Sequence, residues 1–276
     1  LLILRNVNMS STLLEIKDLT VKYILENSEV IANKNISLAI QEGDRSCLLG
    51  FNGSGKTTLL KASIGLLSQD AKIESGKIMF QDKDITQYPD TNFIDYQDSM
   101  KCIRGKEISM IFQNPANYFD PTMKIGKQIY ETLCAHDKIP LLERKKRAIS
   151  LLEEFQVPDP SRVLKKYPVE VSIGTLQKIA IASAFVHKPK LILADEPFSS
   201  IDELSKQSLI QIFKKYQKEY GITILYSLHD LNDIKALCDY VYFMKDGEII
   251  YQDSVTNLFI QKENEDVVDF ISSKQN

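Results

Sequence analysis

Apolar and polar residues form a strand pattern in the N-terminal part of the chain. Residues 13–40 have the pattern of short β-strands, and residues 77–80 form a further strand pattern bounded by Gly76 and Asp82. We therefore expect an antiparallel β portion near the N-terminus.

A helical pattern dominates the middle of the chain. Between Gly126 and Val157, apolar residues recur at helical spacing with polar interruptions. Residues 191–195 instead form a continuous apolar run that ends in a carboxylate, which is typical of a buried parallel strand. The pattern predicts a helical subdomain at about residues 114–185, inserted into an α/β core.

The C-terminal part alternates helix and strand signals. Residues 205–220 have the pattern of a helix closed by Gly221, and residues 222–226 that of the next buried strand. The pair Asp246-Gly247 between two apolar runs predicts a hairpin turn. Residues 257–276 are expected to form a short helical tail, with residues 263–266 as a solvated turn.

Residues 50–57 read Gly-Phe-Asn-Gly-Ser-Gly-Lys-Thr and fit G-x-x-x-x-G-K-[ST]. A strand pattern at residues 47–49 precedes the run and a helical pattern at residues 58–67 follows it, which disfavours an incidental glycine turn. Glycines let the backbone wrap a phosphate chain, with the loop amides facing its charge. The candidate phosphate-binding residues are Gly50, Asn52, Gly53, Ser54, Gly55, Lys56, Thr57 and Thr58.

Within this loop, Lys56 would reach the β- and γ-phosphates and the Thr57 hydroxyl would ligate Mg²⁺. Asp195 and Glu196 follow the buried strand at residues 191–194, where open α/β sheets bind ligands. Asp195 would hold the Mg²⁺ hydration shell, and Glu196 would orient and deprotonate a water for attack on the γ-phosphate. The alternative is that the pair caps the segment beginning at Pro197.

Composition limits the classes of protein to consider. The 276 residues are 43% hydrophobic and 26% charged with a net charge of −3, which is typical of a globular chain and lacks the basic surface of a nucleic-acid binder. The cluster at residues 143–147 is expected to be a solvated helix face. No apolar run suits a membrane span or signal peptide, so we expect a soluble chain that is not secreted, with residues 1–8 an extension before Met9.

Four cysteines lie far apart, at Cys47, Cys102, Cys134 and Cys238. They have no spacing typical of a metal site. An even count is compatible with disulfides, but we expect reduced, small buried residues.

Four further motifs accompany the phosphate loop in a fixed order. Residues 171–177, 23 residues upstream of Asp195 counted from Ser172, correspond to a Leu-Ser-Gly-Gly-x-x-Gln signature. Gln113 ends an apolar strand, His229 follows another, and residues 199–202 read Ser-Ser-Ile-Asp. With these motifs the chain resembles the ATP-binding-cassette (ABC) ATPases from about residue 13 to residue 251.

The resemblance implies a P-loop ABC ATPase fold over residues 13–256, with a mixed or parallel core sheet, an antiparallel β subdomain and an inserted helical subdomain. It assigns Gln113 to Mg²⁺ and the attacking water, and His229 to the γ-phosphate. Tyr23 aligns with the aromatic residue that stacks on adenine, although it could equally be an ordinary strand aromatic. The residues implied to contact a partner's ATP are Ser172, Gly174, Gln177 and Asp202.

Ile173 departs from the signature, because the family has glycine there. A β-branched residue does not adopt positive φ cheaply and keeps backbone away from phosphate. Two cassettes of this family sandwich two ATP molecules, so Ile173 would weaken the partner's site. We expect a heterodimer with one weaker site, with a homodimer as the alternative.

Residues 103–113, 113–121 and 162–168 resemble the peptide and nickel importer branch, and nickel-type chains more closely. The resemblance implies an ATP-hydrolysing subunit of a bacterial importer for nickel, a metal chelate or an oligopeptide. The alternative is a non-transport ABC ATPase of the DNA-repair or translation type. The implied partners are a second ATPase subunit, two integral membrane permease subunits docked at residues 115–123 and, indirectly, an extracellular solute-binding protein. The chain would lie peripherally on the cytoplasmic face of the membrane.

Overall fold

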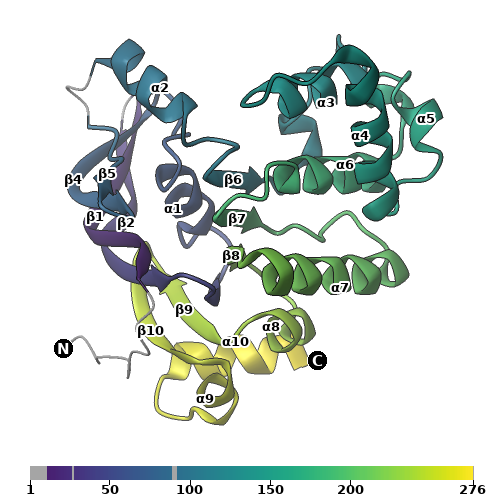
Figure 1. Cartoon of the computed structure of the whole chain (residues 1–276). Helices are drawn as coiled ribbons and strands as arrows, with labels where there is room; N and C mark the ends of the chain where they lie inside the picture. The colour runs from purple at the N-terminus through teal and green to yellow at the C-terminus, as the bar shows by residue number, and fades with distance from the viewer. Residues whose placement is uncertain (1–10, 27, 89–91, 276) are drawn as a thin grey trace. The chain divides into compact units, whose positions relative to one another are not determined.

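The computed structural model describes residues 11–26, 28–88 and 92–275. It consists of two compact units (Figure 1). Unit 1 contains Leu1–Tyr96 and Cys238–Asn276, and unit 2 is Gln97–Leu237. Helix α2 (Phe93–Lys101) includes the boundary between them.

Unit 1 contains the expected antiparallel sheet, with strand order β2-β1-β4-β5. Its strands are β1 (Thr12–Leu25), β2 (Ser28–Gln41), β4 (Ala71–Phe80) and β5 (Lys83–Asp84). Two strands of 14 residues replace the several short strands predicted for residues 13–40. Register shifts within the β1–β2 pair interrupt the alternation of apolar and polar residues, so that each long strand looks broken in the sequence.

The predicted boundary at Gly76 is wrong. Gly76 lies inside β4 with a φ of 92°, and an added Cβ would come within 2.5 Å of the Asp18 carbonyl oxygen. Close approach of β1, and not the end of a strand, requires glycine there.

Unit 1 also contains β3 (Arg45–Gly50), β9 (Tyr240–Lys245) and β10 (Glu248–Ser254). Strand β3 runs parallel to β9, and β9 and β10 form an antiparallel hairpin. Asp246 and Gly247 have φ values of 47° and 81°, as a two-residue primed turn requires, so the predicted hairpin is confirmed.

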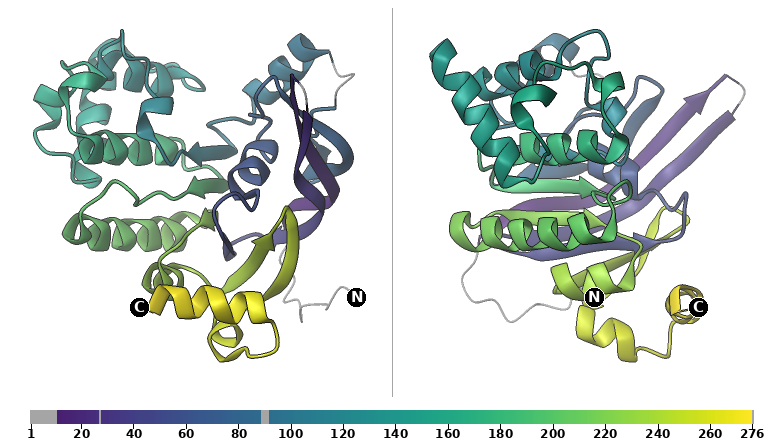
Figure 2. Two further views of the ribbon diagram at one scale, coloured as in Figure 1. Left: turned by 180° about the vertical axis from the view of Figure 1, so that it is seen from behind. Right: turned by 90° about the vertical axis from the view of Figure 1, so that its right-hand side faces the viewer.

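Short helices follow these strands. They are α1 (Lys56–Ala62), α9 (Val255–Ile260) and α10 (Glu265–Gln275). Helix α1 ends before residue 67, because residues 63–65 form a turn in which Gly65 has a φ of 64°. The tail is helical as expected, but residues 265 and 266 form the first turn of α10 and not a separate solvated turn. Figure 2 shows α9 and α10 beside the β9–β10 hairpin.

Unit 2 contains three parallel strands in the order β8-β7-β6, and every residue in them is buried. They are β6 (Ile108–Ile111), β7 (Leu191–Asp195) and β8 (Thr223–Ser227). Helices α7 (Glu203–Tyr220) and α8 (Leu231–Leu237) belong to the same unit. Gly221 ends α7 in the left-handed conformation with a φ of 66°, as predicted.

The predicted helical region lies in unit 2. Its helices are α3 (Ile125–Cys134), α4 (Leu141–Glu154), α5 (Pro160–Val163) and α6 (Ile173–Phe185), with short 3₁₀ turns η1 (Pro115–Asn117) and η2 (Pro168–Glu170). Phe185 of α6 packs between Phe155 and Phe213, with ring centroids 5.3 and 4.9 Å apart. The charged cluster lies on α4, where Arg147 pairs with Glu143 on the surface as expected.

All four cysteines are free. Cys47 and Cys238 are buried, and burial raises the pKa of the Cys238 thiol. The expectation of four buried cysteines is wrong, because Cys102 is exposed and Cys134 is half-buried.

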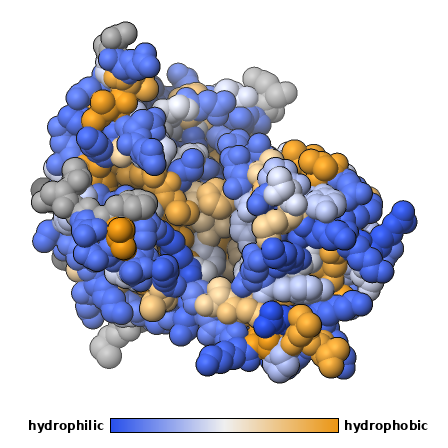
Figure 3. Space-filling view, turned by 90° about the horizontal axis from the view of Figure 1, so that it is seen from above, coloured by the Kyte–Doolittle hydropathy of each residue, from blue (hydrophilic) through white to orange (hydrophobic). Residues whose placement is uncertain are grey.

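None of the helices in the described residues has the length and apolar character of a membrane span. The face drawn in Figure 3 is mostly hydrophilic, with hydrophobic residues in smaller groups.

Candidate active site

The phosphate loop, residues 50–57, connects β3 to α1 in unit 1. Gly50, Gly53 and Gly55 have φ values of 136°, 80° and 97°, which only glycine adopts without strain. An added Cβ at Gly50 would overlap the Met244 carbonyl oxygen, and one at Gly55 would overlap the Ala32 carbonyl oxygen. The loop conformation therefore depends on glycine for both backbone torsion and space.

Lys56 lies within the phosphate loop. Its Nζ donates hydrogen bonds to the carbonyl oxygens of Gly50 and Phe51, both at 2.9 Å, and to Ser54 Oγ at 3.3 Å. Only 6% of the residue is exposed. The structure thus places an ammonium group among the loop's own oxygens, where phosphate oxygens can serve as alternative acceptors.

Two side chains of the β1–β2 hairpin contact this loop and its helix. Asn33 is fully buried, and its Nδ2 donates to the Gly55 carbonyl oxygen at 3.1 Å. Tyr23 Oη lies 3.2 Å from Thr58 Oγ1, so the predicted adenine-stacking residue is beside the start of α1. We did not predict a role for Asn33, although a polar residue on the buried face of a strand was a signal for one.

Alanine at Gly53 and at Gly55 provides a matched comparison. Gly53→Ala is expected to cost roughly 1–2 kcal/mol of unfolding free energy from backbone strain alone, because no atom lies within 4 Å of the added Cβ. Gly55→Ala should cost at least about 2 kcal/mol more, because strand β2 has to move away from the new methyl group. Chemical denaturation without nucleotide measures both losses, and equal losses would contradict the close packing of Gly55.

Unit 2 brings together three predicted residues that are far apart in the chain. Glu196 follows β7, and its Oε2 accepts a hydrogen bond from Gln113 Nε2 at 2.8 Å. Its Oε1 contacts Nε2 of His229, which follows β8. The carboxylate is thus held from two sides, while the preceding Asp195 is 2% exposed at the end of β7.

The backbone of Glu196 is also unusual. Its φ is 43°, in the left-handed region that a residue with a long side chain rarely adopts. Such strained positions occur at functional sites, where the surrounding structure holds them. Here the Glu196 amide donates to the Ser227 carbonyl oxygen at 3.1 Å, which ties the residue to the end of β8.

The signature segment begins α6. Ser172 caps the helix, because its Oγ accepts from the Thr175 amide at 3.2 Å. Gly174 packs closely against the Ser200 carbonyl oxygen, which would lie 2.9 Å from an added Cβ. Gln177 is fully buried and donates to the carbonyl oxygens of Phe112 and Pro197. It therefore joins the segments that carry Gln113 and Glu196 and has no surface for contact with a nucleotide.

The backbone at Ile173 differs from what the sequence led us to expect. It is the first residue of α6 and is absent from the residues with positive φ, so left-handed strain is not the reason for its effect. The residue is 57% exposed. Ile173 therefore departs from the signature through the bulk of an exposed β-branched side chain at a position where the family has glycine.

Asp202 caps the next helix, α7. Its Oδ1 accepts from the Ser205 amide at 2.9 Å, and hydrogen bonds from Ser205 hold the pKa of Asp202 below its ordinary value. Lys178 of α6 donates to Ser205 Oγ at 2.8 Å. The signature helix and the start of α7 are thereby linked.

An ion cluster that the sequence did not reveal surrounds the buried Lys206 and lies next to Glu196 and His229. Lys206 Nζ is 2.9 Å from Glu203, 3.1 Å from Asp233 and 3.6 Å from Asp230. Burial disfavours the charged lysine, yet the hydrogen bonds to Glu203 and Asp233 outweigh it and raise its pKa. Burial also raises the pKa of Asp233, against the opposing effect of Lys206. Lys206, Asp230 and Asp233 line one cavity of about 260 Å³ with Glu196 and His229.

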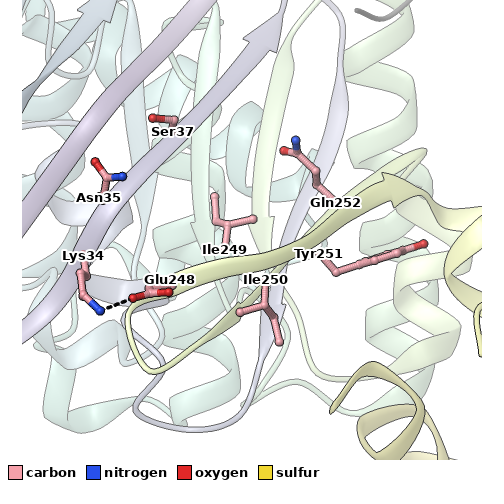
Figure 4. Close-up of a pocket in the computed structure, with 8 residues that line it drawn as sticks. All are labelled: Lys34, Asn35, Ser37, Glu248, Ile249, Ile250, Tyr251 and Gln252. Atoms are coloured by element: carbon pink, nitrogen blue, oxygen red, sulfur yellow. Dashed lines mark ion pairs between the residues drawn. The ribbon is translucent and has the colours of Figure 1, made fainter. Parts of the chain in front are cut away.

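A separate cleft of about 640 Å³ lies between β2 and β10 in unit 1 (Figure 4). Its Lys34 Nζ pairs with Glu248 Oε1 at 2.5 Å, and its Ser37 Oγ donates to Asp18 at 3.1 Å. None of the residues in its lining is a predicted site residue. The cleft is therefore separate from the candidate site.

Comparison with known proteins identifies close similarity to one family. The family model described as "ABC transporter" matches residues 33–199. The oligopeptide transport ATP-binding protein OppD of Bacillus subtilis is 34% identical, and the match covers 90% of this chain and 67% of that protein. The dipeptide transport ATP-binding protein DppD of the same organism is 30% identical, with 91% and 73% covered.

Solved structures show the same similarity. The ATP-binding cassette MJ0796, in a dimeric post-hydrolysis state bound to ADP and phosphate, superposes with a TM-score of 0.76 at 25% identity, covering 88% of this chain and 98% of that one. The protein cbiO1 of Clostridium perfringens, part of the ABC transporter complex cbiONQ, gives a TM-score of 0.69 at 27% identity, with 92% of each chain covered.

Proposed function

This chain belongs to the ABC transporter family, and on that premise we propose that it is the ATP-hydrolysing subunit of an importer of oligopeptides or dipeptides. The observation that carries the catalytic part is the carboxylate of Glu196, held between Gln113 and His229. The matching relatives are named as transport proteins, which disfavours the DNA-repair and translation alternative.

Each unit, taken by itself, offers groups that suit a magnesium nucleotide. In unit 1, the phosphate loop offers glycine backbone and the Lys56 ammonium to phosphate oxygens, and the Thr57 hydroxyl would be a ligand of Mg²⁺. In unit 2, Asp195 and Gln113 carry side-chain oxygens of the kind that Mg²⁺ prefers. Bound there, Mg²⁺ would neutralise charge on the β- and γ-phosphates.

Glu196 would act as the general base. An attacking water gives its proton to the carboxylate as its oxygen bonds to the γ-phosphorus, and the bond to the β–γ bridging oxygen breaks to leave ADP and phosphate. The side-chain amide of Gln113 and the ring of His229 hold the carboxylate in position for this step. His229 can also donate to a γ-phosphate oxygen once nucleotide is bound. Tyr23 would stack on adenine.

The second cassette would complete the site. The neighbouring MJ0796 cassette is dimeric, which supports a dimer here. We propose that the exposed start of α6, with Ser172 and Gly174, and Asp202 at the start of α7 contact the nucleotide held by the partner, while Gln177 positions its neighbours. We propose a heterodimer in which the partner supplies a signature that contains glycine. Such a partner would complete the ATP site of this chain, whose own hydrolytic residues are intact.

Replacing Ile173 with glycine tests the signature proposal. Turnover at the partner's nucleotide site is expected to rise several-fold, because backbone can then approach the partner's phosphate. Turnover by the assembled transporter and nucleotide trapping measure the change, with Val169→Gly as the control, because Val169 is an exposed apolar residue outside the signature. Unchanged turnover and trapping in Ile173→Gly would contradict the asymmetric site.

The membrane partners would be two integral permease subunits, with an extracellular solute-binding protein acting through them and this chain on the cytoplasmic face. We propose residues 115–123 as the permease contact. Phe119 is 5% exposed and packs on Tyr118 with ring centroids 4.7 Å apart, so it belongs to the interior. Of these two rings, we therefore propose that only Tyr118 contacts the permease.

The proposed cargo is tested on the assembled importer in lipid vesicles. The names of the relatives favour peptides over nickel, the cargo to which the sequence motifs were more similar. Peptide presented with the solute-binding protein should stimulate ATP hydrolysis several-fold, and nickel ions should not. Stimulation by nickel alone would overturn the peptide assignment and leave the ATPase assignment in place.

A further inference from the structure

The phosphate loop carries one large aromatic side chain, Phe51. The ring is edge-to-face with Phe243, at a centroid distance of 6.2 Å and an angle of 85°, and with Phe270, at 5.5 Å and 84°. Phe243 and Phe270 are themselves 5.2 Å apart at 82°. We call these three residues the phenylalanine cluster.

Two rings of the cluster belong to the interior of unit 1. Phe243 of β9 is fully buried and Phe270 of α10 is 1% exposed, whereas Phe51 is 42% exposed. Phe51 is thus a loop residue resting against two fixed rings. Its contact with Phe270 joins the phosphate loop to the C-terminal helix.

Helix α10 is itself held firmly to unit 1. Its buried residues Val267, Phe270 and Ile271 are spaced as one helical face. At its first turn, Asp266 pairs with Lys245 of β9, with 2.5 Å between Oδ1 and Nζ. Figure 2 shows the helix beside the hairpin that carries Phe243 and Lys245. Phe270 is therefore presented from a rigid element.

The backbone of Phe51 has a direct part in the phosphate loop. Its carbonyl oxygen and that of Gly50 each accept a hydrogen bond from Lys56 Nζ at 2.9 Å. Any shift of residue 51 moves the oxygens that hold the lysine. The aromatic contact that fixes the Phe51 ring consequently restrains the position of the Lys56 ammonium.

We propose that α10 positions the phosphate loop for nucleotide through the contact of Phe270 with Phe51, so that the C-terminal helix sets ATP affinity. This inference rests on the proposed ATP site. It concerns a helix outside residues 33–199, the part matched by the family model. Phe270 is a positioning residue, because its ring reaches the nucleotide site only through Phe51.

A double-mutant cycle on the full chain tests the coupling. The variants are Phe51→Ala, Phe270→Ala and the double variant, and the measurement is the Kd of a fluorescent N-methylanthraniloyl ATP in the presence of Mg²⁺. Each single change should raise Kd by about two- to tenfold, which corresponds to the interaction free energy of one aromatic pair. The double variant should be no weaker than the weaker single variant, because both changes break the same contact.

Val267→Ala is the matched control, since it shortens another fully buried residue of α10 with no ring to contribute. It should lower the melting temperature while leaving Kd within about twofold. If Phe270→Ala does not fold, Phe270→Leu keeps the bulk, loses the ring and should still raise Kd.

Wild-type Kd in a folded Phe270→Ala or Phe270→Leu variant would overturn the inference. The inference would also be overturned if the two single changes weakened ATP affinity additively in the double variant. An equal loss of ATP affinity in Val267→Ala would overturn it as well. Failure of the wild-type chain to bind the ATP analogue would instead overturn the proposed ATP site itself, so the two failures are distinguishable.

Discussion

Replacing Glu196 with glutamine is expected to slow ATP hydrolysis by about a hundredfold to ten-thousandfold, the usual worth of a general base. Glutamine keeps the shape of the side chain but cannot accept the proton of the attacking water. ATP binding should stay within about twofold of wild type, because the phosphate loop and Lys56 are unchanged. The variant should therefore hold ATP without turning it over.

Phosphate release by the assembled transporter and nucleotide affinity, measured together, separate these two effects. Glu219→Gln is the matched control, because it makes the same chemical change at an exposed position of α7. Turnover in Glu196→Gln within tenfold of wild type would contradict the assignment of Glu196 as the base. Loss of ATP binding in the same variant would show that its carboxylate mainly supports the structure.

Replacing Lys206 with methionine is expected to lower the free energy of unfolding by about 3–5 kcal/mol. Lys206 is 8% exposed and Asp233 is 6% exposed, so the change leaves a buried carboxylate without its cation. Lys215→Met is the control, because its partner Glu154 keeps access to water, with 35% of that side chain exposed. The control should change the denaturation midpoint little.

The loss in Lys206→Met should also depend on pH. Burial already holds the pKa of Asp233 above its ordinary value, and removing the ammonium raises it further. The folded variant then binds a proton where the unfolded chain does not, so its stability falls as pH rises through the raised pKa. The difference from wild type should be large at neutral pH and shrink in acid.

Chemical denaturation of both proteins at neutral and acidic pH measures this difference. The double variant Lys206→Met with Asp233→Asn should recover much of the loss, since neither buried charge is left. A pH-independent loss, or no recovery in the double variant, would contradict the buried-charge explanation.

Local chemistry explains why several features were predictable. The Asp246-Gly247 turn needs two residues with positive φ, and few residue pairs supply them. The helix that ends at Gly221 stops for the same reason, because glycine enters the left-handed conformation at little cost. Each is decided by neighbouring residues, which the sequence displays directly.

Strand length was less predictable. The bulges between β1 and β2 depend on pairing across the sheet, and they reverse the side-chain alternation that signals a strand. Gly76 illustrates the same limit, because β1 requires glycine there and the glycine does not mark an end.

The phosphate loop, its flanking strand and helix, and the separate identities of Asp195, Glu196, Gln113 and His229 could be inferred from sequence alone. Each is defined by residue type and by spacing along the chain. Only the tertiary structure revealed the contacts among side chains that are distant in the chain. These are the contacts of Glu196 with Gln113 and His229, Asn33 with Gly55, Lys206 with its carboxylates, and Phe270 with Phe51. Burial and partner geometry set these interactions, and neither is a property of spacing along the chain.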